Sequence, residues 1–105
     1  MRSGIYAFDY DSGRSGLFNR RLIHVVDTHI ADGIKVSERG YILTAAGSAV
    51  DVIRPSDGVL VGKIAIPAPD RLNNLVAVPG AEWWLVGRNS IWRARIAEQG
   101  IVSYG

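Results

Sequence analysis

Apolar positions along the chain form short runs, which either alternate with polar positions or are broken by glycine, proline and small polar residues. No stretch has the spacing of an amphipathic helix, whereas runs of about five residues rich in β-branched and aromatic side chains are typical of strands. The pattern predicts strands at Ile5–Tyr10, Leu22–Val26, Gly33–Ser37, Tyr41–Ala46, Ala49–Ile53, Leu60–Ile66, Leu75–Val78, Trp83–Val86 and Ser90–Ile96, with a further short strand at Ile101–Tyr104.

The turn signals between these runs repeat along the chain. A hairpin is expected across Glu38-Arg39-Gly40, where the glycine can take a left-handed conformation, and another across Pro79-Gly80-Ala81. The two lie about 40 residues apart, and each is followed by a second hairpin. Such a spacing for units of four strands is typical of β-propeller blades.

Several predicted strands are apolar on both faces. Ile42 and Leu43 point in opposite directions, as do Trp83 and Trp84. A sheet with one wet face should alternate instead, so we expect sheets that are covered on both sides. The sequence therefore predicts an all-β fold, a partial β-propeller of about two and a half blades of antiparallel sheet. The expected limits are 4–26 for the end of one blade, 32–66 for a complete blade and 73–97 for most of another, within a single domain of residues 1–105.

Composition narrows the class of protein further. Hydrophobic residues make up 48% of the chain and charged residues 21%, which excludes a disordered chain. The net charge is only +2 and the arginines are dispersed, so no nucleic-acid partner is expected. The pairs Arg20-Arg21 and Arg93/Arg95 are interpreted as solvated strand faces. There is no cysteine, which excludes disulfides, thiolate metal sites and a cysteine nucleophile.

Targeting signals are also missing from the pattern. No apolar run approaches the ~20 residues that cross a bilayer, so no membrane partner is expected. The start, Met1–Tyr6, enters a strand pattern without the apolar core of a signal peptide, and we expect a cytoplasmic protein.

Asp32 is the leading candidate for chemistry. It lies at the N-terminal end of a predicted innermost strand, where propeller loops gather around the central channel. A carboxylate there is a hard oxygen ligand for Ca²⁺ or Mg²⁺, and also for Mn²⁺ or Zn²⁺. The alternative is an ordinary turn aspartate, because Asp-Gly is a common turn dipeptide. Asn73 and Asn74 open the next innermost strand and are candidates for contacting substrate hydroxyls, or else polar residues at a strand start.

Histidine and tryptophan offer weaker candidates. His24 lies in an apolar strand and His29 in a loop near Asp32, and both are interpreted as structural or solvated rather than as metal ligands. Trp83, Trp84 and Trp92 are interpreted as core and interblade packing rather than as a sugar-stacking platform. The motifs of serine hydrolases, zinc proteases and nucleotide-binding loops are absent from the sequence.

Four segments together resemble the late blades of the gluconolactonase family of six-bladed β-propellers, which includes regucalcin (senescence marker protein). They are Ile5–Asp9, Ala31–Val36, Leu60–Ile64 and Ile91–Ala94. The resemblance implies a hydrolase that opens sugar lactones with a divalent metal, most commonly Ca²⁺, and makes Asp32 both metal ligand and catalytic residue. The family pattern is Pro-Asp-Gly, whereas Ala31 precedes Asp32 here. The family also draws a glutamate and an asparagine from earlier blades, and no segment of this chain corresponds to those blades.

We therefore expect the chain to correspond to the C-terminal part of a lactone hydrolase, either a truncated product or a partial gene model, with an incomplete metal site and weak or no turnover. The alternative is a non-catalytic module that uses exposed blade faces to form homo-oligomers or to bind another protein. A third hypothesis keeps the fold but changes the chemistry, because related propellers hydrolyse organophosphates or bind sugars without turnover.

Overall fold

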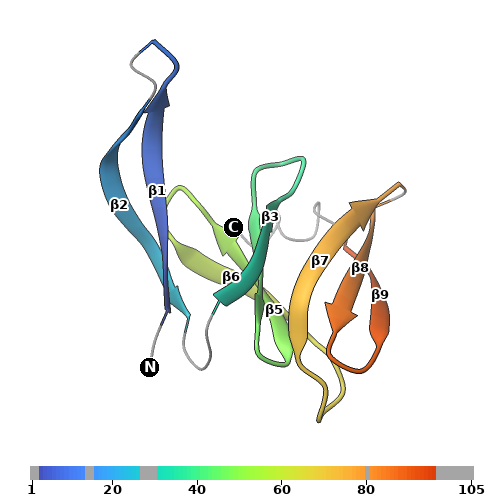
Figure 1. The fold of residues 1–105 in the computed structure, drawn as a ribbon. Helices are drawn as coiled ribbons and strands as arrows, with labels where there is room; N and C mark the ends of the chain where they lie inside the picture. Colours follow the sequence, from blue (N-terminus) through green and yellow to red (C-terminus); the bar gives the residue numbers. More distant parts are fainter. Residues whose placement is uncertain (1–2, 14–15, 27–30, 80, 97–105) are drawn as a thin grey trace.

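The computed structural model describes residues 3–13, 16–26, 31–79 and 81–96, and within them it is built from strands and turns without a helix. The strands are β1 (Ser3–Asp11), β2 (Gly16–Val26), β3 (Ala31–Val36), β4 (Ile42–Ala46), β5 (Ala49–Arg54), β6 (Val59–Ala65), β7 (Leu72–Val78), β8 (Glu82–Gly87) and β9 (Ile91–Arg95). They form three antiparallel sheets in which consecutive strands pair: β1-β2, β3-β4-β5-β6 and β7-β8-β9. The predicted all-β class is confirmed (Figure 1).

The predicted strands within these residues are all present, and the largest difference concerns β2. This strand begins at Gly16 rather than at Leu22, because pairing with β1 continues through Tyr10 and Leu17 to the end of the hairpin. The sequence pattern loses its alternation there since the ladder contains register shifts. Backbone pairing with the long strand β1 therefore makes β2 longer than its own hydrophobic pattern predicts.

The main hydrophobic core lies between the second and third sheets. Its buried side chains come from β4, β5, β7 and β8 and include Leu43, Val50, Val52, Leu72, Leu75, Trp83 and Leu85. A smaller cluster of Ile5, Val26, Ala46 and Ile53 joins the first hairpin to the other face of the second sheet. The middle strands β4 and β5 are consequently buried on both faces, which the adjacent apolar residues Ile42 and Leu43 predicted for β4.

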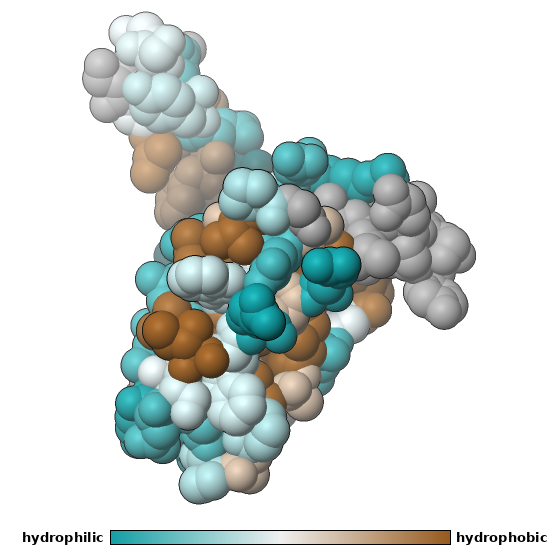
Figure 2. All heavy atoms as spheres, turned by 90° about the vertical axis from the view of Figure 1, so that its right-hand side faces the viewer, coloured by the Kyte–Doolittle hydropathy of each residue, from teal (hydrophilic) through white to brown (hydrophobic). Residues whose placement is uncertain are grey.

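The third sheet differs from the expectation of two covered faces. Trp83 is buried, but its neighbour Trp84 is 43% exposed, and Val76 and Ile91 are exposed as well. Figure 2 views the molecule from this side and shows apolar patches scattered among polar ones. The prediction was wrong for this sheet because its inner face packs on the second sheet while no other described element covers its outer face.

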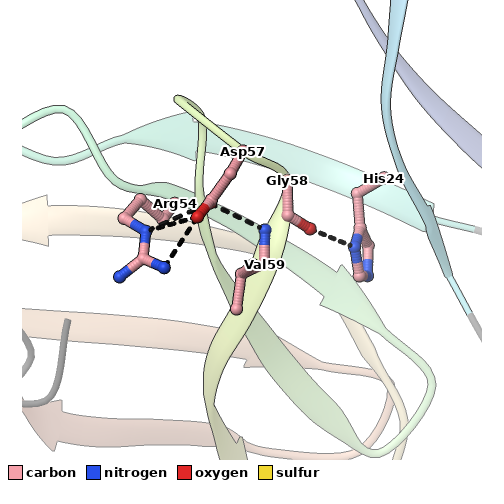
Figure 3. Close-up of polar contacts among 5 residues, drawn as sticks. All are labelled: His24, Arg54, Asp57, Gly58 and Val59. Atoms are coloured by element: carbon pink, nitrogen blue, oxygen red, sulfur yellow. Dashed lines mark hydrogen bonds and ion pairs between the residues drawn. The ribbon is translucent and has the colours of Figure 1, made fainter.

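A turn ties the first hairpin to the second sheet. In the β5–β6 turn, the Asp57 carboxylate accepts hydrogen bonds from Arg54 Nη2 at 2.7 Å and from the Val59 amide at 3.2 Å (Figure 3). Gly58 takes a φ of 73° and lies so close to the Ile23 carbonyl of β2 that a Cβ atom would overlap the carbonyl oxygen. His24 Nδ1 lies 3.0 Å from the Gly58 carbonyl oxygen, which supports the structural interpretation of this histidine. His29 and the predicted strand Ile101–Tyr104 lie outside the described residues.

Candidate functional site

Asp32 and Asn73 occupy equivalent places in two neighbouring sheets. In the β3–β4 ladder, Ala31 pairs with Ala46 and Ile34 with Thr44, which leaves Asp32 and Gly33 opposite a single residue. In the β7–β8 ladder, Leu72 pairs with Gly87 and Asn74 with Val86, so a register shift leaves Asn73 without an opposite residue. Each of the two ladders thus contains a bulge near the start of the first strand of its sheet. Bulges of this kind re-aim side chains and are common beside functional sites.

The two bulges lie against each other. A Cβ atom on Gly33 would stand 2.6 Å from Asn74 Cγ and 2.8 Å from Asn74 Cα, so only glycine fits at this position. On the other side, the Thr44 hydroxyl donates a hydrogen bond to the Gly33 carbonyl at 3.1 Å. Strands β3 and β7, which run side by side in Figure 1, therefore bring the Asp32-Gly33 and Asn73-Asn74 pairs together at one end of the two strands.

The side chains at this end of the two strands differ in whether they already make hydrogen bonds within the protein. Asp32 and Asn73 are exposed, and neither makes a hydrogen bond or ion pair within the part of the chain that is described. Asn74 Oδ1, by contrast, accepts a hydrogen bond from the Leu75 amide at 2.8 Å and one from Lys35 Nζ at 3.4 Å. Of the predicted site residues, Asp32 and Asn73 thus have side chains without a partner among the described residues, while the Asn74 side-chain oxygen already accepts hydrogen bonds from Leu75 and Lys35.

Lys35 was not predicted from the sequence. It lies on β3 opposite the buried Leu43, on the same face as Gly33, and its ammonium reaches Asn74 across the junction with β7. The signal available in the sequence was a charged residue two positions after a glycine in an apolar strand. That signal alone does not show that the lysine lies on the face of the strand that packs against β7.

Two other aspartates are buried, and both have partners within the protein. Asp70 is 4% exposed and accepts hydrogen bonds from Trp92 Nε1 at 2.9 Å, the Arg71 amide at 2.9 Å and the Asn89 amide at 3.0 Å. The Trp92 hydrogen bond is the main cause that lowers the pKa of the Asp70 carboxyl below its ordinary value. Asp51 is 2% exposed, with Oδ1 3.7 Å from Lys63 Nζ. These carboxylates have structural roles, which distinguishes them from Asp32.

The three tryptophans also differ in burial: two pack in the core and one is exposed. Trp83 lies in the main core and Trp92 packs against it, as the sequence predicted. Trp84 is the exception, because its indole is exposed and donates a hydrogen bond to Glu82 at 3.2 Å.

A hollow of about 210 Å³ lies at the opposite end of β3 and β7. It opens between the turns that follow the two strands and is lined by Ser37, Glu38, Pro79, Ala81 and Glu82 among others. Asp32 and Asn73 are at the other ends of these strands, so the hollow does not belong to the predicted site. Among the described residues, no three His, Cys, Asp or Glu side chains gather into a potential metal centre.

Comparison with known proteins agrees with this architecture. No family model matches the chain. It is 34% identical over 97 residues to lactonohydrolase oryH of Aspergillus oryzae, covering 90% of this chain and 20% of the relative. It is 32% identical over 94 residues to lactonohydrolase oryL of the same organism, covering 87% of this chain and 21% of the relative. The chain thus spans about a fifth of the length of these relatives.

A solved structure, a gluconolactonase from Xanthomonas campestris, superposes with a TM-score of 0.70 and 27% identity, covering 84% of this chain and 28% of that one. The fold is therefore that of part of a gluconolactonase β-propeller, as predicted. In sequence and in fold the chain is gluconolactonase-like, which confirms the resemblance seen in its motifs. None of its described segments forms a helix of the length and apolarity that spanning a membrane requires.

Proposed function

We propose that this chain supplies one side of a metal-dependent lactone-hydrolase site, with Asp32 as its reactive carboxylate. The observation that carries the proposal is the exposed Asp32 in a bulge, packed through Gly33 against the equivalent bulge of the next sheet. The similarity to two lactonohydrolases and to a gluconolactonase structure supports a lactone as the substrate class, a sugar lactone in the first instance.

The donor atoms at the junction fit a hard divalent cation in kind. Asp32 offers a carboxylate and Asn73 an amide oxygen, the two ligand types that Ca²⁺ and Mg²⁺ prefer. Such a set is small for Ca²⁺, which takes six to eight oxygens. We therefore propose that the described residues provide part of the coordination and that the chain alone binds Ca²⁺, or in its place Zn²⁺, Mn²⁺ or Mg²⁺, weakly.

The proposed chemistry assigns a separate role to each side chain. A bound divalent cation would polarise a lactone carbonyl and make a water molecule more acidic. Asp32 would hold the ion through one carboxylate oxygen and accept a proton from the attacking water on the other. The Asn73 side-chain N–H groups would donate hydrogen bonds to ligand hydroxyls, which leaves the amide oxygen for the ion. Gly33 and Asn74 would set the position of both through their close contact.

This proposal is tested by titrating the purified chain with Ca²⁺ while following the backbone amide resonances around Gly33. We expect weak, saturable shifts that Asp32→Asn abolishes. Glu38→Gln removes a similar charge from the opposite end of the strand and should leave the titration unchanged. A metal response that survives in Asp32→Asn, or a robust lactonase rate that does not depend on Asp32, would contradict the assignment.

A second candidate function is self-association, which one observation favours. Tyr6, Tyr10, Leu17 and Leu22 are all exposed on the β1–β2 hairpin, and the pairs Tyr6–Leu22 and Tyr10–Leu17 lie directly opposite each other across the two strands. Directly opposed residues share one face of a ladder, so these four side chains form an apolar face. We propose that a second copy of the chain covers this face when the protein acts as a non-catalytic module.

A further inference from the structure

Lys35 occupies an unusual place for a cation. It is half-buried, pairs across the β3–β4 ladder with Leu43, and Leu43 is only 1% exposed. The lysine stem therefore runs along the junction of the second and third sheets, and the ammonium emerges beside Asn74 at 3.4 Å from Oδ1. Lysine commonly buries its stem in this way while keeping the charged end accessible.

The charge of this ammonium is not balanced within the described residues. Arg21, Arg54, Lys63 and Arg93 each have a carboxylate oxygen within 4 Å, at 3.0, 2.7, 3.7 and 3.6 Å respectively. Lys35 has a neutral amide oxygen as its hydrogen-bond partner instead. Asp32, three residues earlier on the strand, is roughly 10 Å away along the backbone, and no ion pair joins it to Lys35 within the described residues. An accessible ammonium that has no carboxylate beside it among the described residues favours an anionic ligand.

We propose that Lys35 is a carboxylate-binding residue at the junction of β3 and β7, placed to recognise an anionic group on the ligand. Its place on the substrate side rests on the proposed lactone-hydrolase function, because hydrolysis converts a neutral lactone into a hydroxy acid. The carboxylate has two possible sources: a substituent on the lactone ring, or the acid group formed when the ring opens. Both present two oxygens to the three N–H donors of an ammonium.

Four probes distinguish these sources when they are titrated into the purified chain at low salt. They are γ-butyrolactone, its open form γ-hydroxybutyrate, a γ-butyrolactone that carries a ring carboxylate, and the neutral methyl ester of that acid. Binding is followed by the amide resonances of Gly33, Lys35 and Leu75 and by the Cε resonance of the Lys35 side chain. We expect the carboxylates to bind more tightly than their neutral counterparts.

The variant series separates a specific contact from a general effect of charge. Lys35→Met keeps the length of the stem and should weaken carboxylate binding at least about tenfold, as expected for losing a hydrogen bond to a charged group, while leaving the neutral probes unchanged. Lys35→Arg should restore most of the affinity. Arg39→Met removes the same charge from an exposed turn and should behave like the parent chain.

The outcomes are distinct. Lys35-dependent binding of γ-hydroxybutyrate alone identifies the product acid as the ligand, whereas dependence confined to the ring carboxylate identifies a substrate substituent. Equal weakening by Lys35→Met and Arg39→Met, or a Lys35 Cε resonance that carboxylates do not move in the parent chain, would overturn the proposal. The second readout holds even where Lys35→Met fails to fold. If Asp32→Asn leaves metal binding intact while carboxylate binding still needs Lys35, the hydrolase function fails and the carboxylate site stands.

Discussion

At the scale of single residues, the aspartates of this chain have different roles because their surroundings differ. Asp70 is buried and surrounded by N–H donors from Arg71, Asn89 and Trp92. Asp57 holds a turn together through Arg54, and that hydrogen bond is the main cause that lowers its pKa. Asp32 is exposed and has no such partner among the described residues. A carboxylate that makes no stabilising hydrogen bond within the fold can bind a ligand without lowering the stability of the protein.

Asp70 should make stability depend on pH. Its pKa is lowered in the folded chain, chiefly by the Trp92 indole, so its contribution is fully present above the ordinary carboxyl pKa and is lost as the pH falls through the lower, folded value. We expect Asp70→Asn to lower the free energy of unfolding at pH 7, and the deficit to shrink below about pH 4. Denaturant unfolding across this range measures it. Asp32→Asn is the control, because this carboxylate is exposed and has no hydrogen-bond partner among the described residues, and it should leave the free energy of unfolding at pH 7 unchanged. A deficit for Asp70→Asn that does not vary with pH would argue against the assigned role.

Gly33 should be intolerant of any side chain. A Cβ atom would overlap Asn74, so Gly33→Ala must push β3 away from β7 and should lower the free energy of unfolding by about 1–3 kcal/mol. It should also shift the amide resonances of Lys35 and Leu75. Gly62→Ala provides the matched control, because no atom lies within 4 Å of the Cβ that it adds. Comparable losses in the two variants would show that the junction is not tightly packed.

At the scale of elements, each sheet is a local antiparallel structure, and the sheets meet through hydrophobic cores and through a few turns and bulges. Consecutive strands pair in all three sheets, so apolar runs and turn residues predicted the strands, apart from the first part of β2. The β5–β6 turn, in contrast, contacts β2 from a distant part of the sequence through Gly58. Its Pro-Ser-Asp-Gly sequence predicts a turn but says nothing of what the turn touches.

Two glycines with positive φ differ in the space around them, so substituting each one measures a different cost: backbone strain alone at Gly40, and backbone strain with steric overlap at Gly58. Gly40 has a φ of 92° with open space around it, whereas Gly58 has a φ of 73° and lies against the Ile23 carbonyl. We expect Gly40→Ala to lower the free energy of unfolding by about 1 kcal/mol, the cost of the left-handed conformation, and Gly58→Ala to lower it by about 2–4 kcal/mol. Only Gly58→Ala should also perturb the His24 ring resonances. Equal effects of the two variants would mean that the first hairpin is not docked through this turn.

At the scale of the whole molecule, the chain exposes more surface than a compact domain of its size. Its accessible surface is 6751 Å², against about 5800 Å² expected for a folded monomer of this mass. Part of the excess comes from the β1–β2 hairpin, which extends away from the other sheets in Figure 1 and has an exposed apolar face. Apolar faces of this kind favour association.

Self-association should therefore depend on this hairpin. We expect the purified chain to show concentration-dependent association in light scattering coupled to size-exclusion chromatography, and the double variant Tyr10→Ser/Leu17→Ser to reduce it. The two side chains are 67% and 63% exposed, so their replacement should barely change monomer stability. Trp84→Ser, on the outer face of the third sheet, tests whether another apolar surface is used instead. Association that only Trp84→Ser reduces would assign the interface to the third sheet.

The sequence by itself determined the strands apart from the first part of β2, the turns, the all-β class, the likeness to gluconolactonases and the place of Asp32 at the start of a strand. These features depend on neighbouring residues and on the period of a strand, which can be read from one segment at a time. For the same reason the burial of both faces of β4 followed from the adjacent apolar residues Ile42 and Leu43.

Only the tertiary structure decided which side chains meet. The contact of Gly33 with Asn74, the approach of Lys35 to Asn74, the hydrogen bond from Trp92 to Asp70 and the exposure of Trp84 all join or separate residues according to sheet packing. A bulge of one residue reverses the faces of the side chains that follow it, and two bulges lie at this junction. Sequence alternation does not locate such shifts, so the contacts of Gly33 and Lys35 with Asn74 could be known only once β3 and β7 lay side by side.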